Sequence, residues 1–351
     1  MKCVKSVLLI AVFALLDSPI SWAAEGPTGD TAQGGADKGT IGRPVRIISI
    51  GKCNKSPEEM AELVDREAAT GADLIVLPEM WPKSKKPVTL EDAPITTLAA
   101  VAKKHQIYII SPILRKEEGT AYNSAVVLDR QGKVLGVYDK LFPVLADPPE
   151  VKDRGEQVRP GADAYVFEAD FGRIGMAICF DAQFPEVWHR LAHNGAQLVL
   201  FSGISSGGQT LGAYAMLHHY YIVCCTNSGE CQVYDITGDK LLHERKGISR
   251  ITLDMDRRIL HTNDFYNKWP VPGQKLDRLL KENPGVVIDK KMPREEWYVL
   301  KATQPDVDVP ALIRKYDMQT LQTFLRKQRE QGATKRGFQF TRQGPPANVA
   351  K

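Results

Sequence analysis

Residues 172–201 read GRIGMAICFDAQFPEVWHRLAHNGAQLVLF and carry the clearest local structure in the chain. A β-rich run over Arg173–Ile178 leads directly into Cys179, and Pro185–Asn194 then predicts a helix that begins on a proline and stops before a glycine. Leu198–Phe201 is a further apolar run, as expected for a buried strand. Cys179 therefore lies at a strand-to-helix turn, where a side chain is exposed and backbone N–H groups are free.

The same alternation of strands and helices extends on both sides of this stretch. Apolar runs predict strands over residues 45–50, 74–77, 107–110, 121–128, 134–138, 165–168, 222–226, 232–234, 240–243 and 248–253, with helices over 56–70, 95–104 and 210–219. Two turn sequences, DRQG at 129–132 and ADFG at 169–172, join neighbouring strands into hairpins. Hairpins inside a βα alternation favour an α/β layered sandwich with mixed sheets over a purely parallel fold.

Two further chemically useful side chains follow predicted strands. The run LIVL at 74–77 is followed by Pro78 and Glu79, and the strand that ends in Tyr138 is followed by Asp139 and Lys140. Alone, each residue is typical of an ordinary loop, and a lone cysteine in an apolar strand is usually a core residue. Glu79, Lys140 and Cys179 together, each at a strand end, predict one catalytic site.

At these three blocks the chain resembles the nitrilase superfamily of carbon–nitrogen hydrolases. The resemblance rests on LPEMWP around Glu79, YDKLFP around Lys140 and the stretch around Cys179, and it covers roughly residues 45–254. It implies a four-layer α-β-β-α sandwich, with Glu79 as general base, Lys140 as the cation that stabilises an oxyanion, and Cys179 as nucleophile. The backbone N–H of Phe180 is placed to be the second oxyanion donor.

The expected reaction is hydrolysis of a non-peptide carbon–nitrogen bond, in an amide or an N-carbamoyl group of a small molecule. A carboxylate takes the thiol proton as sulfur attacks, loss of ammonia or an amine leaves a thioester, and water releases the acid. True nitrilases usually carry Cys-Trp-Glu at the nucleophile, whereas this chain has Cys-Phe-Asp at 179–181, similar to amidases and carbamoylases. Those enzymes often have arginine at the position of Gln183, so we expect the contact of this residue with the substrate or a neighbouring loop to differ.

Further site residues are expected from neighbouring segments. The family often uses a second glutamate between the lysine and the cysteine, for which we favour Glu150 over Glu156. The polar, glycine-rich stretch at 202–208 follows a strand, and we expect Ser202 and Gly203 in it to form part of the substrate-binding wall. We expect no metal and no cofactor.

The N-terminal residues have the layout of a secretory signal peptide. Lys2 and Lys5 precede an apolar run of about ten residues over Val7–Leu16, and small residues follow at 21–24. We expect residues 1–24 to be cleaved, the protein to be periplasmic or extracellular, and the glycine-rich residues 25–44 to be a flexible linker. Cleavage leaves five cysteines, and a disulfide among Cys224, Cys225 and Cys231 stays open.

Residues 45–254 are the predicted carbon–nitrogen hydrolase domain, and residues 255–351 are a C-terminal extension. The extension contains a predicted helix over 309–331 and a basic tail, and we expect it to pack on the core or on a partner subunit of a homodimer or higher homo-oligomer. A net charge of +4 in 351 residues is too weak to indicate a nucleic-acid binder, and after signal cleavage we expect no membrane span.

Other functions are compatible with parts of this sequence. A non-catalytic binding protein on the same fold is the main rival, and an N-acyltransferase, in which an amine replaces water, is a second. A papain-like hydrolase would need a histidine partner for Cys179, and no histidine of this chain lies in a recognisable partner motif. A metal site at His218, His219 and the three cysteines at 224, 225 and 231 is disfavoured, because adjacent helical histidines diverge and no CxxC pair is present.

Overall fold

The computed structural model describes residues 40–144, 158–261 and 274–335. In these residues two six-stranded mixed sheets form the core, with strand orders β12-β1-β2-β3-β4-β5 and β11-β10-β9-β8-β7-β6. The first sheet consists of β1 (Pro44–Ile50), β2 (Leu74–Val76), β3 (Tyr108–Glu117), β4 (Thr120–Leu128), β5 (Val134–Asp139) and β12 (Ile248–Asp254). The second consists of β6 (Val166–Ala169), β7 (Gly172–Ile178), β8 (Leu198–Gly203), β9 (Tyr221–Thr226), β10 (Cys231–Tyr234) and β11 (Lys240–Glu244).

Each sheet has a parallel centre and antiparallel flanks. Strands β1, β2 and β3 pair in parallel, as do β7, β8 and β9, while hairpins such as β4–β5 and β6–β7 pair antiparallel. The carboxyl ends of the parallel strands therefore collect at one edge of each sheet.

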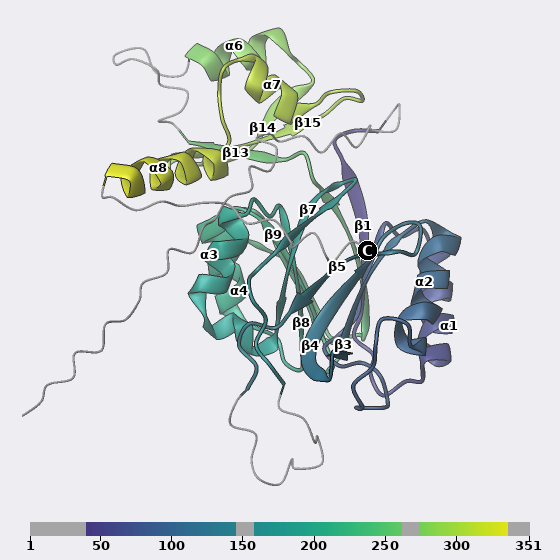
Figure 1. Cartoon of the computed structure of the whole chain (residues 1–351). Helices are drawn as coiled ribbons and strands as arrows, with labels where there is room; N and C mark the ends of the chain where they lie inside the picture. Colours follow the sequence, from purple (N-terminus) through teal and green to yellow (C-terminus); the bar gives the residue numbers. More distant parts are fainter. Residues whose placement is uncertain (1–39, 145–157, 262–273, 336–351) are drawn as a thin grey trace, which may run out of the picture.

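Helices cover the outer faces of the two sheets (Figure 1). Helices α1 (Pro57–Ala68) and α2 (Ala93–His105) lie on the first sheet, and α3 (Pro185–His193) and α4 (Gln209–His218) lie on the second. One buried cluster joins residues of both sheets, such as Val76 and Met176, and another joins the first sheet to Met60 of α1 and Leu98 of α2. The predicted α/β fold class with mixed sheets is thus confirmed, and the layers run α, β, β, α.

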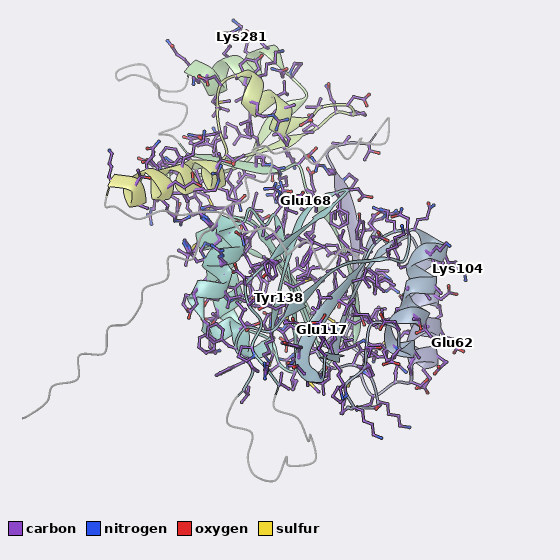
Figure 2. All side chains as sticks on the ribbon, viewed as in Figure 1. Glu62, Lys104, Glu117, Tyr138, Glu168 and Lys281 are labelled. Atoms are coloured by element: carbon purple, nitrogen blue, oxygen red, sulfur yellow. The ribbon has the colours of Figure 1, made fainter. Side chains whose placement is uncertain are left out.

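The distribution of side chains follows from this layering. Tyr138 is fully buried between the sheets, whereas Glu62 and Lys104 lie on the outer sides of the helices (Figure 2). Helix α1 begins as its sequence predicts, because Ser56 accepts a hydrogen bond from the Glu59 backbone and the Glu59 carboxylate accepts one from the Ser56 backbone.

The C-terminal extension contains more structure than its sequence indicates. Strands β13 (Arg258–His261), β14 (Val286–Met292) and β15 (Trp297–Ala302) form a small antiparallel sheet, which packs with α6 (Gln274–Glu282) and α7 (Val309–Lys315). The single helix expected over 309–331 is wrong: the structure has α7 and a separate α8 (Leu321–Lys335). The chain breaks the helix at Asp317, which has φ +52°, and the Met318 backbone N–H turns back to the carbonyl of Ile313.

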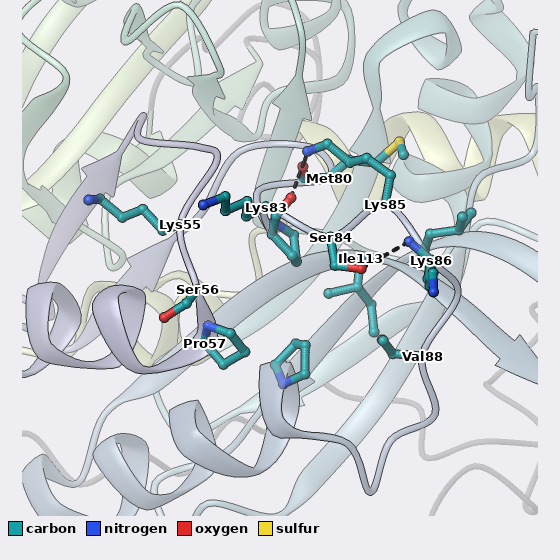
Figure 3. A pocket seen from close by; sticks show the side chains of 13 residues that line it. Lys55, Ser56, Pro57, Met80, Lys83, Ser84, Lys85, Lys86, Val88 and Ile113 are labelled. Carbon is teal, nitrogen blue, oxygen red and sulfur yellow. Dashed lines mark hydrogen bonds between the residues drawn. The ribbon is translucent and has the colours of Figure 1, made fainter. Parts of the chain in front are cut away.

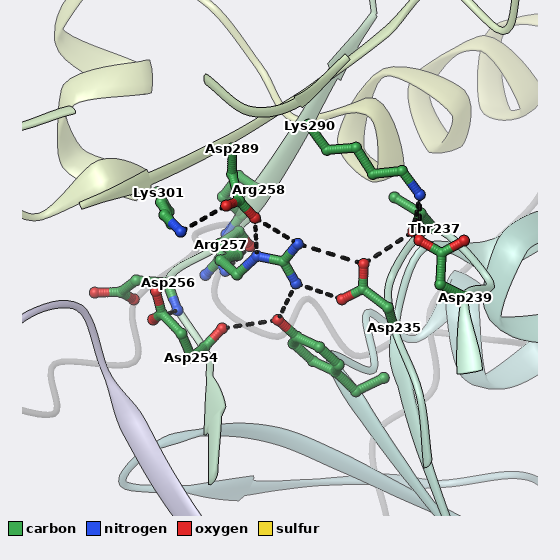
Figure 4. Close-up of polar contacts among 11 residues, drawn as sticks. Asp235, Thr237, Asp239, Asp254, Asp256, Arg257, Arg258, Asp289, Lys290 and Lys301 are labelled. Carbon is green, nitrogen blue, oxygen red and sulfur yellow. Dashed lines mark hydrogen bonds and ion pairs between the residues drawn. The ribbon is translucent and has the colours of Figure 1, made fainter. Parts of the chain in front are cut away.

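A half-buried arginine ties this extension to the core (Figure 4). Arg257 pairs with the buried Asp235 after β10, donates to the Tyr221 hydroxyl at 3.0 Å and pairs with Asp289 of β14 at 2.8 Å. Helix α8 adds a second tie, since Gln322 donates to the carbonyl of Ala196 at 2.8 Å. The small sheet and α8 are therefore fixed against the second sheet of the core.

No helix in the described ranges is both long and apolar enough to cross a membrane. The predicted signal peptide, residues 25–39 of the predicted linker and the basic end of the tail lie outside the described residues. The five cysteines from Cys53 to Cys231 are free thiols there, so the structure pairs none of Cys224, Cys225 and Cys231.

Candidate active site

Cys179 lies where β7 ends and a short 3-10 helix, η2 (Cys179–Gln183), begins. Its φ is +46°, a left-handed value that is unusual for a residue with a Cβ atom and that marks a sharp turn. The side chain is half-buried and packs at the margin of the inter-sheet core. Cys179 therefore lies at the end of β7, outside the paired part of the sheet. The backbone N–H of Phe180, the expected oxyanion donor, is the next one along the chain, at the start of η2.

Glu79 comes three residues after β2 and is only 2% exposed. Among the described residues, three donors hold its carboxylate. Oε1 accepts from Lys140 Nζ at 3.0 Å and from Asn123 Nδ2 at 2.7 Å, and Oε2 accepts from the Ile204 backbone N–H at 3.1 Å. The donors come from three different segments, so the carboxylate has one orientation.

Lys140 follows β5 directly and is 3% exposed, so it forms a buried ion pair with Glu79. Its backbone is fixed on both sides, since its N–H donates to the carbonyl of Asn123 at 2.8 Å and its carbonyl accepts from Gly161 N–H at 2.9 Å. The ammonium group is therefore held in place by the fold and by Glu79 together.

The charges of this pair act on the Cys179 thiol. Burial raises the pKa of the thiol, and the negative charge of Glu79 raises it further, while Lys140 and the Ile204 amide act in the opposite direction. The side chain of Glu79 thus acts on the thiol directly. The resting sulfur is therefore protonated at neutral pH with a carboxylate beside it, which is an arrangement for proton transfer coupled to nucleophilic attack.

A buried carboxylate, Asp181, aligns the segments that carry the lysine and the cysteine. It accepts hydrogen bonds from the backbone N–H of Ile178 at 2.9 Å, from that of Phe142 at 3.0 Å, and from the Tyr138 hydroxyl at 2.7 Å. Burial raises the pKa of Asp181, and these hydrogen bonds oppose the shift. The chain just before Cys179 and the chain just after Lys140 are thus fastened to the same side chain.

The last two residues of β8, Ser202 and Gly203, make structural contacts that the sequence did not predict. The buried Ser202 hydroxyl donates to the carbonyl of Leu77 at 2.8 Å, and the Gly203 carbonyl accepts from Asn227 N–H at 3.0 Å. Both groups therefore support the Glu79 segment and the next loop, and substrate contact by either residue stays a prediction. Beside them the side chains of Ile204 and Phe180 are 57% and 40% exposed.

Glu150 and Glu156, the candidates for the second glutamate, lie outside the described residues. Within the described ranges, no three histidine, cysteine or acidic side chains gather in a way that could hold a metal ion.

Sequence reasoning missed three contacts of the candidate site. Two are the hydrogen bonds to Glu79 from the Asn123 amide and from the Ile204 backbone N–H. The third is the set of hydrogen bonds that Asp181 accepts from the segments beside Cys179 and Lys140. The available signals were weak. Asn123 is a polar residue of β4 that shortly precedes the apolar run at 125–128, and Asp181 is an acid two residues after a strand-end cysteine. A backbone donor such as Ile204 leaves no trace in the residue types.

Residues 55–263 match the sequence model of the family described as Carbon-nitrogen hydrolase, which is more than half of the chain. This chain belongs to that family. The expected membership of the nitrilase superfamily is thereby confirmed.

Curated relatives include several carbon–nitrogen hydrolases. The chain is 32% identical to a human omega-amidase over 39% of this chain and 54% of that protein. It is 26% identical to a deaminated glutathione amidase of Synechocystis over 53% of this chain and 76% of that protein. A Schizosaccharomyces pombe hydrolase is 26% identical over 58% of this chain and 73% of that protein. The chain thus spans between about half and three quarters of these three relatives.

Solved structures share the fold. An amidase of the nitrilase superfamily from Nesterenkonia AN1 has a TM-score of 0.52 at 21% identity and covers 62% of this chain and 92% of that one. Saccharomyces cerevisiae Nit3, a member of the same superfamily, also has a TM-score of 0.52, at 18% identity over 61% of this chain and 91% of that one.

Proposed function

We propose that this carbon–nitrogen hydrolase cleaves a small-molecule amide, or an N-carbamoyl group, through a thioester on Cys179. The observation that carries the proposal is a buried glutamate that is ion-paired to a lysine and whose charge acts on the thiol at a strand-to-helix turn. Two curated relatives are named for amidase activity, which supports an amide substrate for this chain.

In the first half of the proposed reaction, Glu79 takes the proton from the Cys179 sulfur as that sulfur attacks the amide carbon. The carbonyl oxygen becomes an oxyanion, which Lys140 and the Phe180 backbone N–H stabilise. Glu79 then returns the proton to the leaving nitrogen, the carbon–nitrogen bond breaks, and ammonia or an amine departs. The acyl group remains on sulfur as a thioester.

The second half repeats the proton transfers with water. Glu79 takes a proton from water as its oxygen attacks the thioester carbon, and the same oxyanion donors stabilise the tetrahedral intermediate. The carbon–sulfur bond breaks, the sulfur recovers a proton from Glu79, and the carboxylic acid leaves. Glu150, or Glu156 in its place, is proposed to assist as the second carboxylate.

A substrate screen tests this proposal. The purified protein is incubated with simple amides, N-carbamoyl compounds and nitriles, and ammonia release is followed, with Cys179→Ala as the blank. We expect release from amides or carbamoyl compounds by the unmodified protein alone. Added hydroxylamine distinguishes acyl transfer, since a transferase would divert most of the acyl group to the hydroxamate. Failure to turn over any member of the three classes would favour the binding-protein alternative.

We also propose that the protein is exported and forms homo-oligomers. The basic, apolar and small-residue segments at 1–24 support export, and N-terminal sequencing of protein from the native host tests it, with a start near Glu25 expected. Exposed apolar side chains of α4, Met216 and Leu217, support self-association, and light scattering of the purified protein measures its mass.

A further inference from the structure

A cavity lies beside the segment that carries Glu79, and the three candidate catalytic side chains do not line it. It has a volume of about 340 Å³, within the range of small-molecule pockets, and it lies between the loop after Glu79 and the first turns of α1 and α2 (Figure 3). Glu79, Lys140 and Cys179 are not among its lining residues. It is lined by Lys55, Ser56, Pro57, Met80, Pro82, Lys83, Ser84, Lys85, Lys86, Val88, Pro94, Ile113 and Leu114.

The charged groups of this cavity are all cationic. Lys85 is committed to the loop, since its ammonium group donates to the carbonyls of Met80 and Pro82, both at 2.7 Å. Lys55, Lys83 and Lys86 form no ion pair within the described part of the chain, and no described acidic residue lines the cavity. The result is a group of three lysines that form no ion pair with a described carboxylate.

Acidic residues of the neighbouring helix are already engaged. Glu58 and Glu59 in the first turn of α1 both bond Ser56, the first through its hydroxyl at 2.8 Å and the second through its backbone N–H at 2.7 Å. Both carboxylates therefore form hydrogen bonds at the N-terminus of α1 and form no ion pair with the cavity lysines.

The remaining wall is apolar and rigid. Prolines, a valine and the buried side chains of Ile113 and Leu114 form it, and Figure 3 shows Pro57, Ile113 and Val88 on one side of the lysines. Val88 is fixed by backbone hydrogen bonds to Leu114 at 2.9 Å and from Lys116 at 2.7 Å. A ligand here would bury apolar surface against a wall that is already formed.

We propose that this cavity binds a small carboxylate with an apolar body, such as an aryl or medium-chain acid. The apolar body fills the space against Val88 and Ile113, and the carboxylate faces the ammonium groups of Lys55, Lys83 and Lys86. A neutral amide lacks the charge, and an inorganic anion lacks the apolar body, so both are weaker ligands. This binding goes beyond the proposed hydrolysis and does not depend on it.

The site also adjoins the catalytic glutamate along the chain. Met80 lines the cavity, directly follows Glu79 and has a left-handed φ of +49°. Lys85 holds the Met80 carbonyl from the cavity side. A bound acid therefore contacts the segment that positions Glu79.

The test uses 4-bromobenzoate as the probe and the full-length Cys179→Ala protein, which removes turnover. Calorimetry should show saturable binding of 4-bromobenzoate, with weaker binding of 4-bromobenzamide and of acetate. Lys83→Gln/Lys86→Gln should weaken 4-bromobenzoate binding about two- to thirtyfold, as the loss of two exposed charges predicts. The matched control, Lys103→Gln/Lys133→Gln, changes two exposed lysines elsewhere and should leave the affinity unchanged.

The bromine atom then locates the ligand. Crystals grown with 4-bromobenzoate should show an anomalous peak between Val88 and Ile113. A peak only beside residue 179, no bound ligand in solution, or equal weakening by both lysine pairs would each overturn the proposal. Because none of these readouts uses turnover, failure of the proposed hydrolysis would leave the test intact.

Discussion

Replacing Asn123 by alanine removes one of the donors that hold the Glu79 carboxylate. Asn123 is 7% exposed, and its Nδ2 lies 2.7 Å from Glu79 Oε1. Its other amide atom, Oδ1, has no hydrogen-bond partner among the described residues, so alanine removes no second contact there. The substitution therefore isolates a single hydrogen bond to a buried charge.

A hydrogen bond to a charged group contributes about 1.5–3 kcal/mol. If this bond holds Glu79 in its catalytic orientation, Asn123→Ala should lower kcat/KM about 10- to 150-fold, at about 1.4 kcal/mol for each factor of ten. The assay is ammonia release from the best substrate of the screen.

Asn194 provides a matched control for this substitution. It is also 7% exposed, its Nδ2 donates to the Ala164 carbonyl at 2.8 Å, and its Oδ1 likewise has no partner in the described residues. Asn194→Ala should lower the free energy of unfolding by an amount similar to Asn123→Ala while leaving kcat/KM unchanged. Full activity in Asn123→Ala, or an equal loss in Asn194→Ala, would refute the positioning role.

Three further outcomes are expected. Lys140→Met should lower the free energy of unfolding by about 3–5 kcal/mol, because it leaves the Glu79 carboxylate buried without its cation, and Glu79→Gln/Lys140→Met should recover much of that loss in urea unfolding. Cys179→Ser should keep its circular dichroism spectrum and thermal melt but show no turnover, since a serine hydroxyl is a poor nucleophile here. Burial lowers the pKa of His218 to about 3, against 6.5 for an exposed histidine. The unfolded chain thus takes up this proton first, and stability falls as pH drops from 6.5 toward 3 by up to about 1.4 kcal/mol per unit. His218→Gln should flatten that slope between pH 7 and pH 5.

Local chemistry explains which parts of the fold were predictable. The turn at 129–132 could be located because Asp129 accepts from two backbone N–H groups and Gly132 takes a left-handed φ of +74°, both of which the residue types favour. Buried strands such as β8 are continuous apolar runs bounded by helix signals.

The extension was harder because its signals are weak. Strand β14 reads VVIDKKM and has only one fully buried residue, so its polar side chains hide the strand pattern. The break between α7 and α8 falls at Tyr316, Asp317 and Met318, where no glycine or proline marks the end of a helix. Packing of Tyr316 and Met318 into the small C-terminal core decides the break.

Some residues of the candidate site could likewise be predicted from the sequence, and others could not. Glu79, Lys140 and Cys179 could be found because each follows a strand in a distinctive sequence context. Asn123 could not, because it is 44 residues from Glu79 and meets it only through pairing of β4 within the first sheet. The Ile204 amide is 125 residues from Glu79, and only the packing of the two sheets brings them together.

Trapping of the acyl-enzyme tests the central claim most directly. The protein is mixed with its best amide substrate, quenched in acid within the first turnovers, and digested for peptide mass spectrometry. The mechanism predicts an added acyl mass on the peptide that contains Cys179, with Cys53, the other half-buried thiol, unmodified. Steady turnover with no acyl group on Cys179, together with retained activity in Cys179→Ala, would contradict it.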